Sequence, residues 1–216
     1  MTKYLLLLIA YLLGSIPFSF LLGKIFRGQD IRKLGSGNMG TSNAFRCFGK
    51  PIGFTVLFAD TLKSGLIVFL MVQTGLFDGV ELFHPLFYGF ASVLGHVFPI
   101  WFKFKGGKGV ATAFGLLLTY QPLLGLGMVL AFLITEYITR YVSVASTVSS
   151  ILAFITVSIM FILSPVYDNL IFMIITGLTM IVIIVRHKSN YKRLKSGTEN
   201  RVKLFDKLDA FLGKNK

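Results

Sequence analysis

Acidic residues and cysteine are scarce in this chain, and both shortages limit its chemistry. Only 9 of the 216 residues are Asp or Glu, against 22 Lys or Arg, which gives a formal net charge of +13. Cys47 is the only cysteine, so an intramolecular disulfide is excluded, and no Cys/His cluster or carboxylate-rich loop suggests a metal cage. We therefore expect no metal and no other cofactor.

Charge of either sign is also sparse. Charged residues make up 14% of the chain, hydrophobic residues make up 54%, and the mean hydropathy is +0.74, whereas soluble domains carry about 25% charged residues. The composition predicts an all-α integral membrane protein. The excess of basic residues then reflects membrane topology, and we expect no nucleic-acid partner. A cleaved signal peptide is not expected, since only Lys3 precedes the first apolar run.

Seven apolar segments are candidates for transmembrane helices, which need roughly 20 apolar residues to cross a bilayer. The fourth and fifth are short and meet at a turn, Gln121–Pro122. Pro17 is expected to kink the first. A five-span alternative treats Val110–Thr139 as one long or re-entrant element. The segments are Tyr4–Gly23, Pro51–Phe77, Pro85–Phe102, Val110–Tyr120, Pro122–Thr139, Val142–Leu163 and Leu170–Val185.

Basic residues gather on one side of this seven-helix arrangement. Twenty of the 22 Lys and Arg fall in residues 24–50, 103–109, 140 and 186–216. The positive-inside rule then predicts an N-terminus outside and a cytoplasmic C-terminus. We treat residues 1–201 as a single membrane domain and residues 202–216 as a basic amphipathic tail, in which Val202–Leu212 is a candidate interfacial helix.

The first of three polar loops on the expected cytoplasmic side is Gly35–Arg46. Glycines let backbone amides turn around an anion, neutral polar side chains add hydrogen bonds, and Arg46 can hold a phosphate with two parallel bonds. No Gly-Lys-Ser/Thr ends the loop, so it is not a Walker A loop. The candidate ligands are Ser36, Gly37, Asn38, Gly40, Thr41, Asn43 and Arg46.

The second loop, Lys103–Gly109, alternates lysines with glycines between two apolar helices. The next helix is expected to begin near Gly109, so its first amides would also face an anion. An ordinary basic loop is the alternative. The candidates here are Lys105, Gly106, Gly107, Lys108 and Gly109.

The third loop, Arg186–Arg201, offers an imidazole at His187, an amide at Asn190 and several cations, including Arg193. A basic anchor for anionic lipid headgroups is its rival interpretation. Glu199 is expected to order the loop through its basic neighbours. Ser143, at the preceding cytoplasmic turn, is a candidate to join the site.

Two ionisable residues interrupt the second apolar segment. Asp60 and Lys63 lie three residues apart and therefore share a helix face. Because ionisable groups inside a span are costly, they are usually paired or functional, and a structural pair and a pair at the edge of the site are equally favoured here. His96 is favoured as an interior histidine with its hydrogen bonds satisfied.

In this order and at these spacings, GSGNMGTSNAFR, GHVFPIWFKFKGGKGVAT and HKSNYKRLKSGTENR resemble the motifs of the bacterial acyl-phosphate:glycerol-3-phosphate acyltransferase family (PlsY). The resemblance runs from the first span to Arg201, with one local departure at Met39, where a proline is expected. It also implies that Thr112 and Gly197, together with Gly109 and Glu199, contribute to substrate binding.

The resemblance implies acyl transfer from acyl phosphate to the sn-1 hydroxyl of glycerol-3-phosphate, the first acylation of phospholipid synthesis. The products are 1-acyl-glycerol-3-phosphate and phosphate. It implies a location in the bacterial cytoplasmic (inner) membrane with a cytoplasmic active site. The partners are then acyl phosphate, glycerol-3-phosphate, the lipid bilayer and, as a further candidate, the enzyme that supplies acyl phosphate.

The residues favour direct attack without an acyl-enzyme, since no His-x4-Asp or Ser-His-Asp arrangement is evident. We hypothesise that Arg46, Lys105 and Lys108 neutralise phosphates. Polar groups of the first loop, including the amides of Gly37 and Gly40, orient the acyl phosphate and its oxyanion. His187, Asn190 and Arg193, with Ser143, close the glycerol-3-phosphate side. The catalytic set is Ser36, Asn38, Arg46, Lys108 and His187.

The resemblance implies that a substrate phosphate takes the hydroxyl proton, with His187 as the rival base. Two other function classes stay open. A transporter of phosphorylated metabolites would use the same cations and glycines, but most spans show few polar residues. A structural lipid-binding protein would explain the basic face, but not the Asn, Gly and Thr pattern of the first loop.

Overall fold

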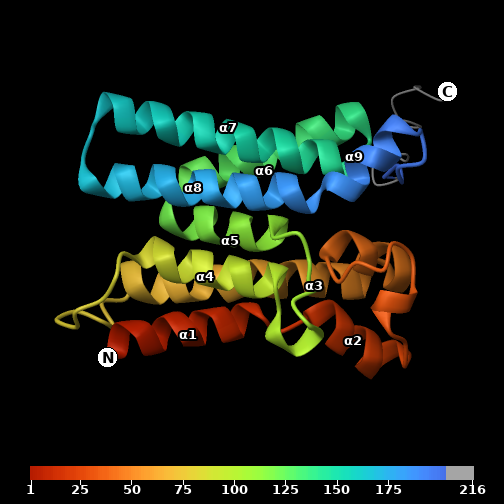
Figure 1. Cartoon of the computed structure of the whole chain (residues 1–216), viewed down its shortest axis with the longest axis horizontal. Helices are drawn as coiled ribbons and strands as arrows, with labels where there is room; N and C mark the ends of the chain where they lie inside the picture. The colour runs from red at the N-terminus through yellow and green to blue at the C-terminus, as the bar shows by residue number, and fades with distance from the viewer. Residues whose placement is uncertain (203–216) are drawn as a thin grey trace.

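The computed structural model describes residues 1–202, and the ordered elements in that range are all helical (Figure 1). The expected tail helix Val202–Leu212 falls almost wholly outside the described residues. The α-helices are α1 (Thr2–Gly14), α2 (Phe18–Arg27), α3 (Thr41–Val72), α4 (Pro85–Val97), α5 (Val110–Tyr120), α6 (Pro122–Thr139), α7 (Val142–Leu163), α8 (Tyr167–Arg186) and α9 (Lys188–Lys195). Two 3₁₀ turns cover Ile31–Lys33 and Ile100–Phe102.

Among residues 1–202, five segments are individually long and apolar enough to cross a membrane. A sixth forms if α1 and α2, bent by 42°, make one broken span, and the break contains Pro17 as expected. Helix α6 has the predicted bounds and was expected to be short for a span, but its 18 residues are long and apolar enough to cross a membrane. The apolar helix α5 belongs to none of these spans and is short: its 11 residues rise about 16 Å, roughly half of a 30 Å hydrocarbon core.

The helix boundaries differ from the prediction in two places that affect the polar loops. Helix α3 begins at Thr41, so the end of the first loop is helical, and a kink at Gly49 (φ 82°) separates this turn from the long span. The buried side chains of Ala44 and Phe48 pack with Ile31 and hold the early turn in place. The third loop likewise contains α9.

The helices form a bundle with α5 at its centre, between α7 and α8 on one side and α1, α3 and α4 on the other (Figure 1). Glycines allow the closest approaches: a Cβ on Gly95 of α4 would lie 2.1 Å from the carbonyl oxygen of Tyr11 in α1. The outer faces carry exposed apolar side chains such as Leu126, Leu130 and Ile162. A surface of this kind is suited to contact with lipid.

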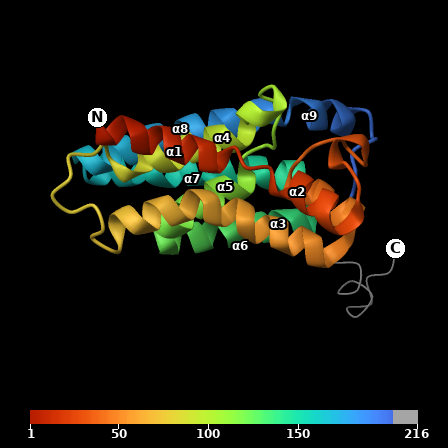
Figure 2. The ribbon, with the colours of Figure 1, turned by 90° about the horizontal axis from the view of Figure 1, so that it is seen from below.

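The three polar segments lie together at one end of the bundle, and the N-terminus lies at the other (Figures 1 and 2). We call the end that carries Gly35–Gly40, Lys103–Gly109 and α9 the basic end. At the opposite end Lys3 pairs with Glu81 and His84 lies 3.5 Å from Asp168. The gathering of the polar segments at one end is as expected, whereas the described residues contain five or six candidate spans, not seven.

Candidate active site

The first loop is shaped by the side chain of Asn43, from the first turn of α3. Its Oδ1 accepts from the Ser36 amide at 3.0 Å, and its Nδ2 donates to the carbonyls of Leu34 and Asn38, both at 3.0 Å. Asn43 is 2% exposed, so its hydrogen-bonding capacity is used inside the protein. Asn43 thus supports the loop, and its expected contact with substrate stays a prediction.

The amides of Gly37 and Gly40 also bond within the loop, and their expected role as oxyanion donors stays a prediction. The Gly37 amide donates to the Leu34 carbonyl, and the Gly40 amide donates to Asn38 Oδ1, both at 2.9 Å. The next amides, those of Thr41 and Ser42, open α3 and have no intrahelical carbonyl to bond. They are the better anion donors of this loop, beside the exposed hydroxyl of Ser36.

The glycines of the second loop are required by close packing against α4. The amides of Gly106 and Gly107 donate to the carbonyls of Val97 and His96, at 3.1 and 3.0 Å. A Cβ on Gly107 would lie 2.0 Å from His96 Nε2. These two glycines therefore hold the loop against α4, and their expected part in substrate binding stays a prediction.

The loop ends at Gly109, the residue before α5, as predicted. Thr112 is fully buried behind it, with its hydroxyl bonded to the Gly109 carbonyl at 2.9 Å. Thr112 therefore supports the end of the loop, and its expected part in substrate binding stays a prediction. Lys105 is exposed, whereas Lys108 is half-buried and turned toward α9.

Lys108, Asn190, Glu199 and Arg193 form a continuous network across the second and third segments. Lys108 Nζ donates to Asn190 Oδ1, and Asn190 Nδ2 donates to Glu199 Oε1 at 2.6 Å. Arg193 Nε donates to Glu199 Oε2 at 2.7 Å, and the Ser143 hydroxyl lies 3.4 Å from Oε1. Glu199 orders the third segment, as expected, and Ser143 is within its reach.

Gly197 explains how Glu199 reaches this position. The chain turns back after α9 with Gly197 in the left-handed region (φ 71°), and its amide donates to the Leu194 carbonyl. Gly197 is exposed and serves this turn, and its expected contact with substrate stays a prediction.

Lys108 is electrostatically unusual. Burial lowers its pKa to about 8. Burial is the main cause of this pKa; the Glu199 charge opposes it, and the positive charges of Arg193, Arg186 and Arg46 add to it. The exposed Arg46, from α3, is thus close enough for its charge to act on Lys108, as the charges of Arg186 and Arg193 do. A concentration of positive charge of this kind favours a phosphate.

His187 lies between α8 and α9 and is 1% exposed. Its Nδ1 is 2.8 Å from the Ile183 carbonyl; this bond requires a proton on Nδ1 and leaves Nε2 as an acceptor. Burial, reinforced by the charge of Lys108, lowers the pKa of His187 to about 4. The imidazole is thus neutral near pH 7.

Two residues of the site were missed by the sequence analysis. Arg186 Nη2 donates to the Gly106 carbonyl at 3.1 Å and so connects α8 to the second loop. The Tyr191 hydroxyl lies 2.6 Å from Thr147 Oγ1, and its ring stacks on His187. Their proximity to His187 in the sequence was the available signal.

In residues 1–202, no group of three or more His, Cys, Asp or Glu side chains is arranged to hold a metal ion. The site consists of cations, amides and hydroxyls. The segments that carry its expected members lie at the basic end (Figure 2), so the arrangement can bind phosphate groups and stabilise developing negative charge.

Comparisons with known proteins give the same result. The family model described as Glycerol-3-phosphate acyltransferase matches residues 4–197. The glycerol-3-phosphate acyltransferase of Enterococcus faecalis is 47% identical over 203 residues, covering 91% of this chain and 90% of the relative. Glycerol-3-phosphate acyltransferase 3 of Bacillus anthracis is 46% identical over 198 residues, covering 92% and 94%.

Solved structures of PlsY (YgiH), an integral membrane glycerol 3-phosphate acyltransferase, have the same fold. Its glycerol 3-phosphate form matches with a TM-score of 0.82 and 36% identity, over 96% of this chain and 99% of that one. Its lysophosphatidic acid form matches with a TM-score of 0.78 and 36% identity, over 93% and 95%. The chain therefore belongs to the glycerol-3-phosphate acyltransferase family and is a multi-pass membrane acyltransferase.

Proposed function

We propose that this protein transfers a fatty acyl group from acyl phosphate to the sn-1 hydroxyl of glycerol-3-phosphate, independently of CoA. The observation that carries the proposal is the network at the basic end, in which Lys108, Asn190, Glu199 and Arg193 connect two segments. Both proposed substrates carry a phosphate, and the site supplies cations for both. The long chain of the donor lies in the bilayer while its headgroup meets these loops.

The acceptor phosphate is assigned to the third segment. Arg193 and Lys108 supply positive charge, and the Glu199 carboxylate holds the Arg193 guanidinium in place. Ser143 and Asn190 orient the glycerol hydroxyls through hydrogen bonds. Glu199 acts on the substrate through these neighbours, as a positioning residue.

The donor phosphate is assigned to the first loop and the start of α3. The free amides of Thr41 and Ser42, the Ser36 hydroxyl and the Arg46 guanidinium surround it. Asn38 holds the loop conformation through the Gly40 amide. Lys105, exposed on the second loop, adds positive charge nearby.

In the reaction step, the sn-1 oxygen attacks the carbonyl carbon of the acyl phosphate. The new carbon–oxygen bond forms, the bond from the carbonyl carbon to the phosphate oxygen breaks, and inorganic phosphate leaves. Because an acyl phosphate is already activated, positioning and charge stabilisation supply the catalysis. No covalent acyl-enzyme forms.

The hydroxyl proton goes to the departing phosphate. A histidine whose pKa is lowered to about 4 is a weak base at pH 7, because the ideal catalytic pKa lies near the working pH. His187 instead presents Nε2 as a hydrogen-bond acceptor to the acceptor substrate. The rival, with His187 as the general base, requires a proton on a deeply buried ring.

The site is assigned to the cytoplasmic face of the bacterial inner membrane. The support is the concentration of Lys and Arg at the basic end, opposite Asp78, Glu81 and Asp168. The acyl phosphate must then come from an enzyme that works at the same face. The N-terminus lies outside and the C-terminus in the cytoplasm.

The test is formation of 1-acyl-glycerol-3-phosphate from palmitoyl phosphate and labelled glycerol-3-phosphate in proteoliposomes. Wild-type protein is expected to form the product, and Lys108→Ala to lose most of the rate. The matched control is Lys3→Ala, at the opposite end, with wild-type turnover. Uptake of labelled glycerol-3-phosphate without product would contradict the proposal and favour a transporter.

A further inference from the structure

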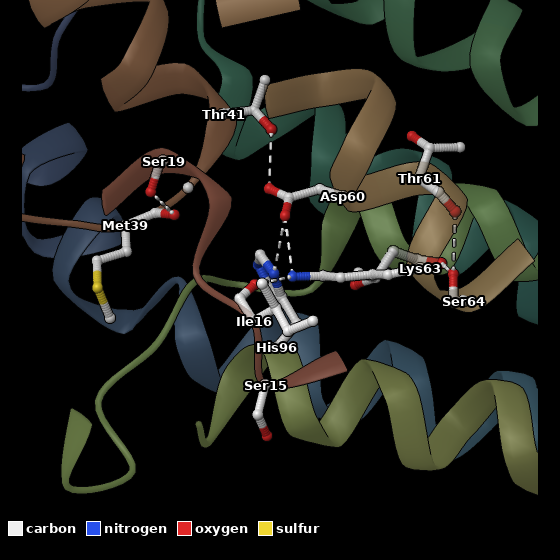
Figure 3. Close-up of polar contacts among 12 residues, drawn as sticks. Ser15, Ile16, Ser19, Met39, Thr41, Asp60, Thr61, Lys63, Ser64 and His96 are labelled. Carbon is white, nitrogen blue, oxygen red and sulfur yellow. Dashed lines mark hydrogen bonds and ion pairs between the residues drawn. The ribbon is translucent and has the colours of Figure 1, made fainter. Parts of the chain in front are cut away.

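A buried ionic cluster lies beneath the two loops that flank the site and is absent from the proposed chemistry (Figure 3). Asp60 of α3, 1% exposed, places Oδ1 2.9 Å from Lys63 Nζ and 3.5 Å from His96 Nδ1. Its Oδ2 lies 3.4 Å from the Thr41 hydroxyl, at the start of α3. One carboxylate thus meets two helices and the end of the first loop.

Lys63 extends the cluster to the break between α1 and α2. Its Nζ donates to the Ile16 carbonyl at 3.1 Å. That carbonyl precedes Pro17, which has no N–H and interrupts the helix. From the next turn, the Ser19 hydroxyl donates to the Met39 carbonyl at 2.6 Å. The broken span is thereby tied to Asp60 on one side and to the first loop on the other.

His96 extends the cluster to the second loop. Its carbonyl accepts the Gly107 amide, and its ring occupies the space that a side chain at position 107 would need. The Asp60 carboxylate fixes the ring from the other side through Nδ1. Lys108 follows directly after Gly107, so the orientation of His96 sets where Lys108 begins.

A small cavity lies among these contacts and is lined by residues of both loops and of the cluster. It has a volume of about 10 Å³, room for one water molecule. Its walls include Met39 from the first loop, Gly106 and Gly107 from the second, and the three ionisable side chains. A movement of any wall is therefore transmitted to both loops, because packed interiors do not deform continuously.

We propose that Asp60, Lys63 and His96 form a brace that sets the relative position of the first loop and of the loop carrying Lys108. The three are positioning residues that do not touch substrate. The consequence for catalysis rests on the proposed acyl transfer. An ionic brace inside a span is costly, and apolar replacements of a buried ion pair are often as stable, so stability alone does not explain this one.

Two variants separate positioning from stability. Asp60→Asn removes the carboxylate charge and leaves the Lys63 ammonium unpaired and buried. The double variant Asp60→Asn/Lys63→Met removes both charges, so its thermal stability is expected to return toward wild type. It still lacks the bond to Ile16 and the charge that orients His96. Val157→Ala, a cavity variant in α7, is the matched control for stability loss alone.

The first readout is hydrogen–deuterium exchange in peptides covering residues 34–43 and 100–109, which needs no turnover. Both single and double variants are expected to exchange faster in both peptides, while Val157→Ala matches wild type there. The second readout is kcat/KM for glycerol-3-phosphate well below the melting temperature. It is expected to fall roughly 10²-fold in both brace variants and to stay unchanged in Val157→Ala.

The proposal is overturned if the double variant regains wild-type exchange and kcat/KM together with its stability, since the cluster would then serve the fold alone. It is also overturned if exchange rises in one peptide only. A wild-type protein without turnover would sink the proposed function, and the exchange experiment would still decide the brace. If Asp60→Asn does not fold, the double variant carries both readouts.

Discussion

Lys108 donates a hydrogen bond to the side-chain amide of Asn190, which lies 82 residues further along the chain. This bond connects the loop before α5 to α9 and brings a lysine with a lowered pKa into contact with the Glu199 network. A cation held in this way can meet a phosphate without losing much rotamer freedom on binding.

The ionisation of Lys108 predicts the alkaline limb of the pH profile. Its pKa in the free protein is about 8, so the cation is present below that pH and disappears as the pH rises through it. We expect kcat/KM for glycerol-3-phosphate to fall about tenfold per pH unit above that point. Lys108→Arg stays charged and is expected to lack this limb, although its turnover is lower. An identical limb in both proteins would assign the titration elsewhere.

Removing the Glu199 charge is expected to disorder the third segment. Its two oxygens accept from Asn190 and Arg193, and hydrogen bonds to charged groups contribute about 1.5–3 kcal/mol each. We predict that Glu199→Gln lowers kcat/KM about 10²-fold, measured by product formation. The control is Glu81→Gln, which removes the partner of Lys3 at the opposite end. Wild-type activity in Glu199→Gln would remove Glu199 from the site.

Adding one methyl group at Gly107 tests how closely the second loop packs against α4. In Gly107→Ala the new Cβ would lie 2.0 Å from His96 Nε2, so loop and ring must separate at a cost of about 1–3 kcal/mol. Activity and melting temperature should both fall. Gly127→Ala in α6 is the matched control, because a Cβ there meets nothing within 4 Å. Equal activity and equal melting temperature of the two variants would contradict the close packing of Gly107 against His96.

Replacing His187 distinguishes transfer of the hydroxyl proton to the departing phosphate from transfer to His187. Since burial lowers its pKa to about 4, it stays neutral across the working pH range. We predict that His187→Gln, which keeps a hydrogen-bonding group at the end of the side chain, retains kcat within about tenfold of wild type. Stopped-flow phosphate release would measure this. A loss of about 10³-fold, as expected for a missing general base, would favour the rival scheme.

The sequence was sufficient for the all-helical membrane fold and for the polar segments at one end, because both depend on local signals, but not for the number of spans, which is five or six instead of seven. Long uncharged runs specify helices, and basic loops specify a side. The helix boundary at Gly109 and the break at Pro17 followed from glycine and proline chemistry. The third segment was expected as a loop, but it contains α9, which carries Asn190 and Arg193 and has His187 at its N-terminal cap.

The use of each polar group was less predictable, because it depends on contacts between distant segments. Asn43 and the amides of Gly37 and Gly40 have the right chemistry for a phosphate, yet the fold uses them internally. The short distance from Gly107 to His96 has no sequence signal either. Asp60 and Lys63 were recognisable as a pair, but His96 as their third member was not.

The central claim is direct acyl transfer from acyl phosphate to glycerol-3-phosphate. The most direct test is phosphate release by purified protein given palmitoyl phosphate, with and without glycerol-3-phosphate, with palmitoyl-CoA as a separate donor. We predict release that depends on glycerol-3-phosphate, matches the 1-acyl product mole for mole, and has no counterpart with the CoA donor. Product formation from palmitoyl-CoA, or release that is independent of glycerol-3-phosphate, would contradict the account.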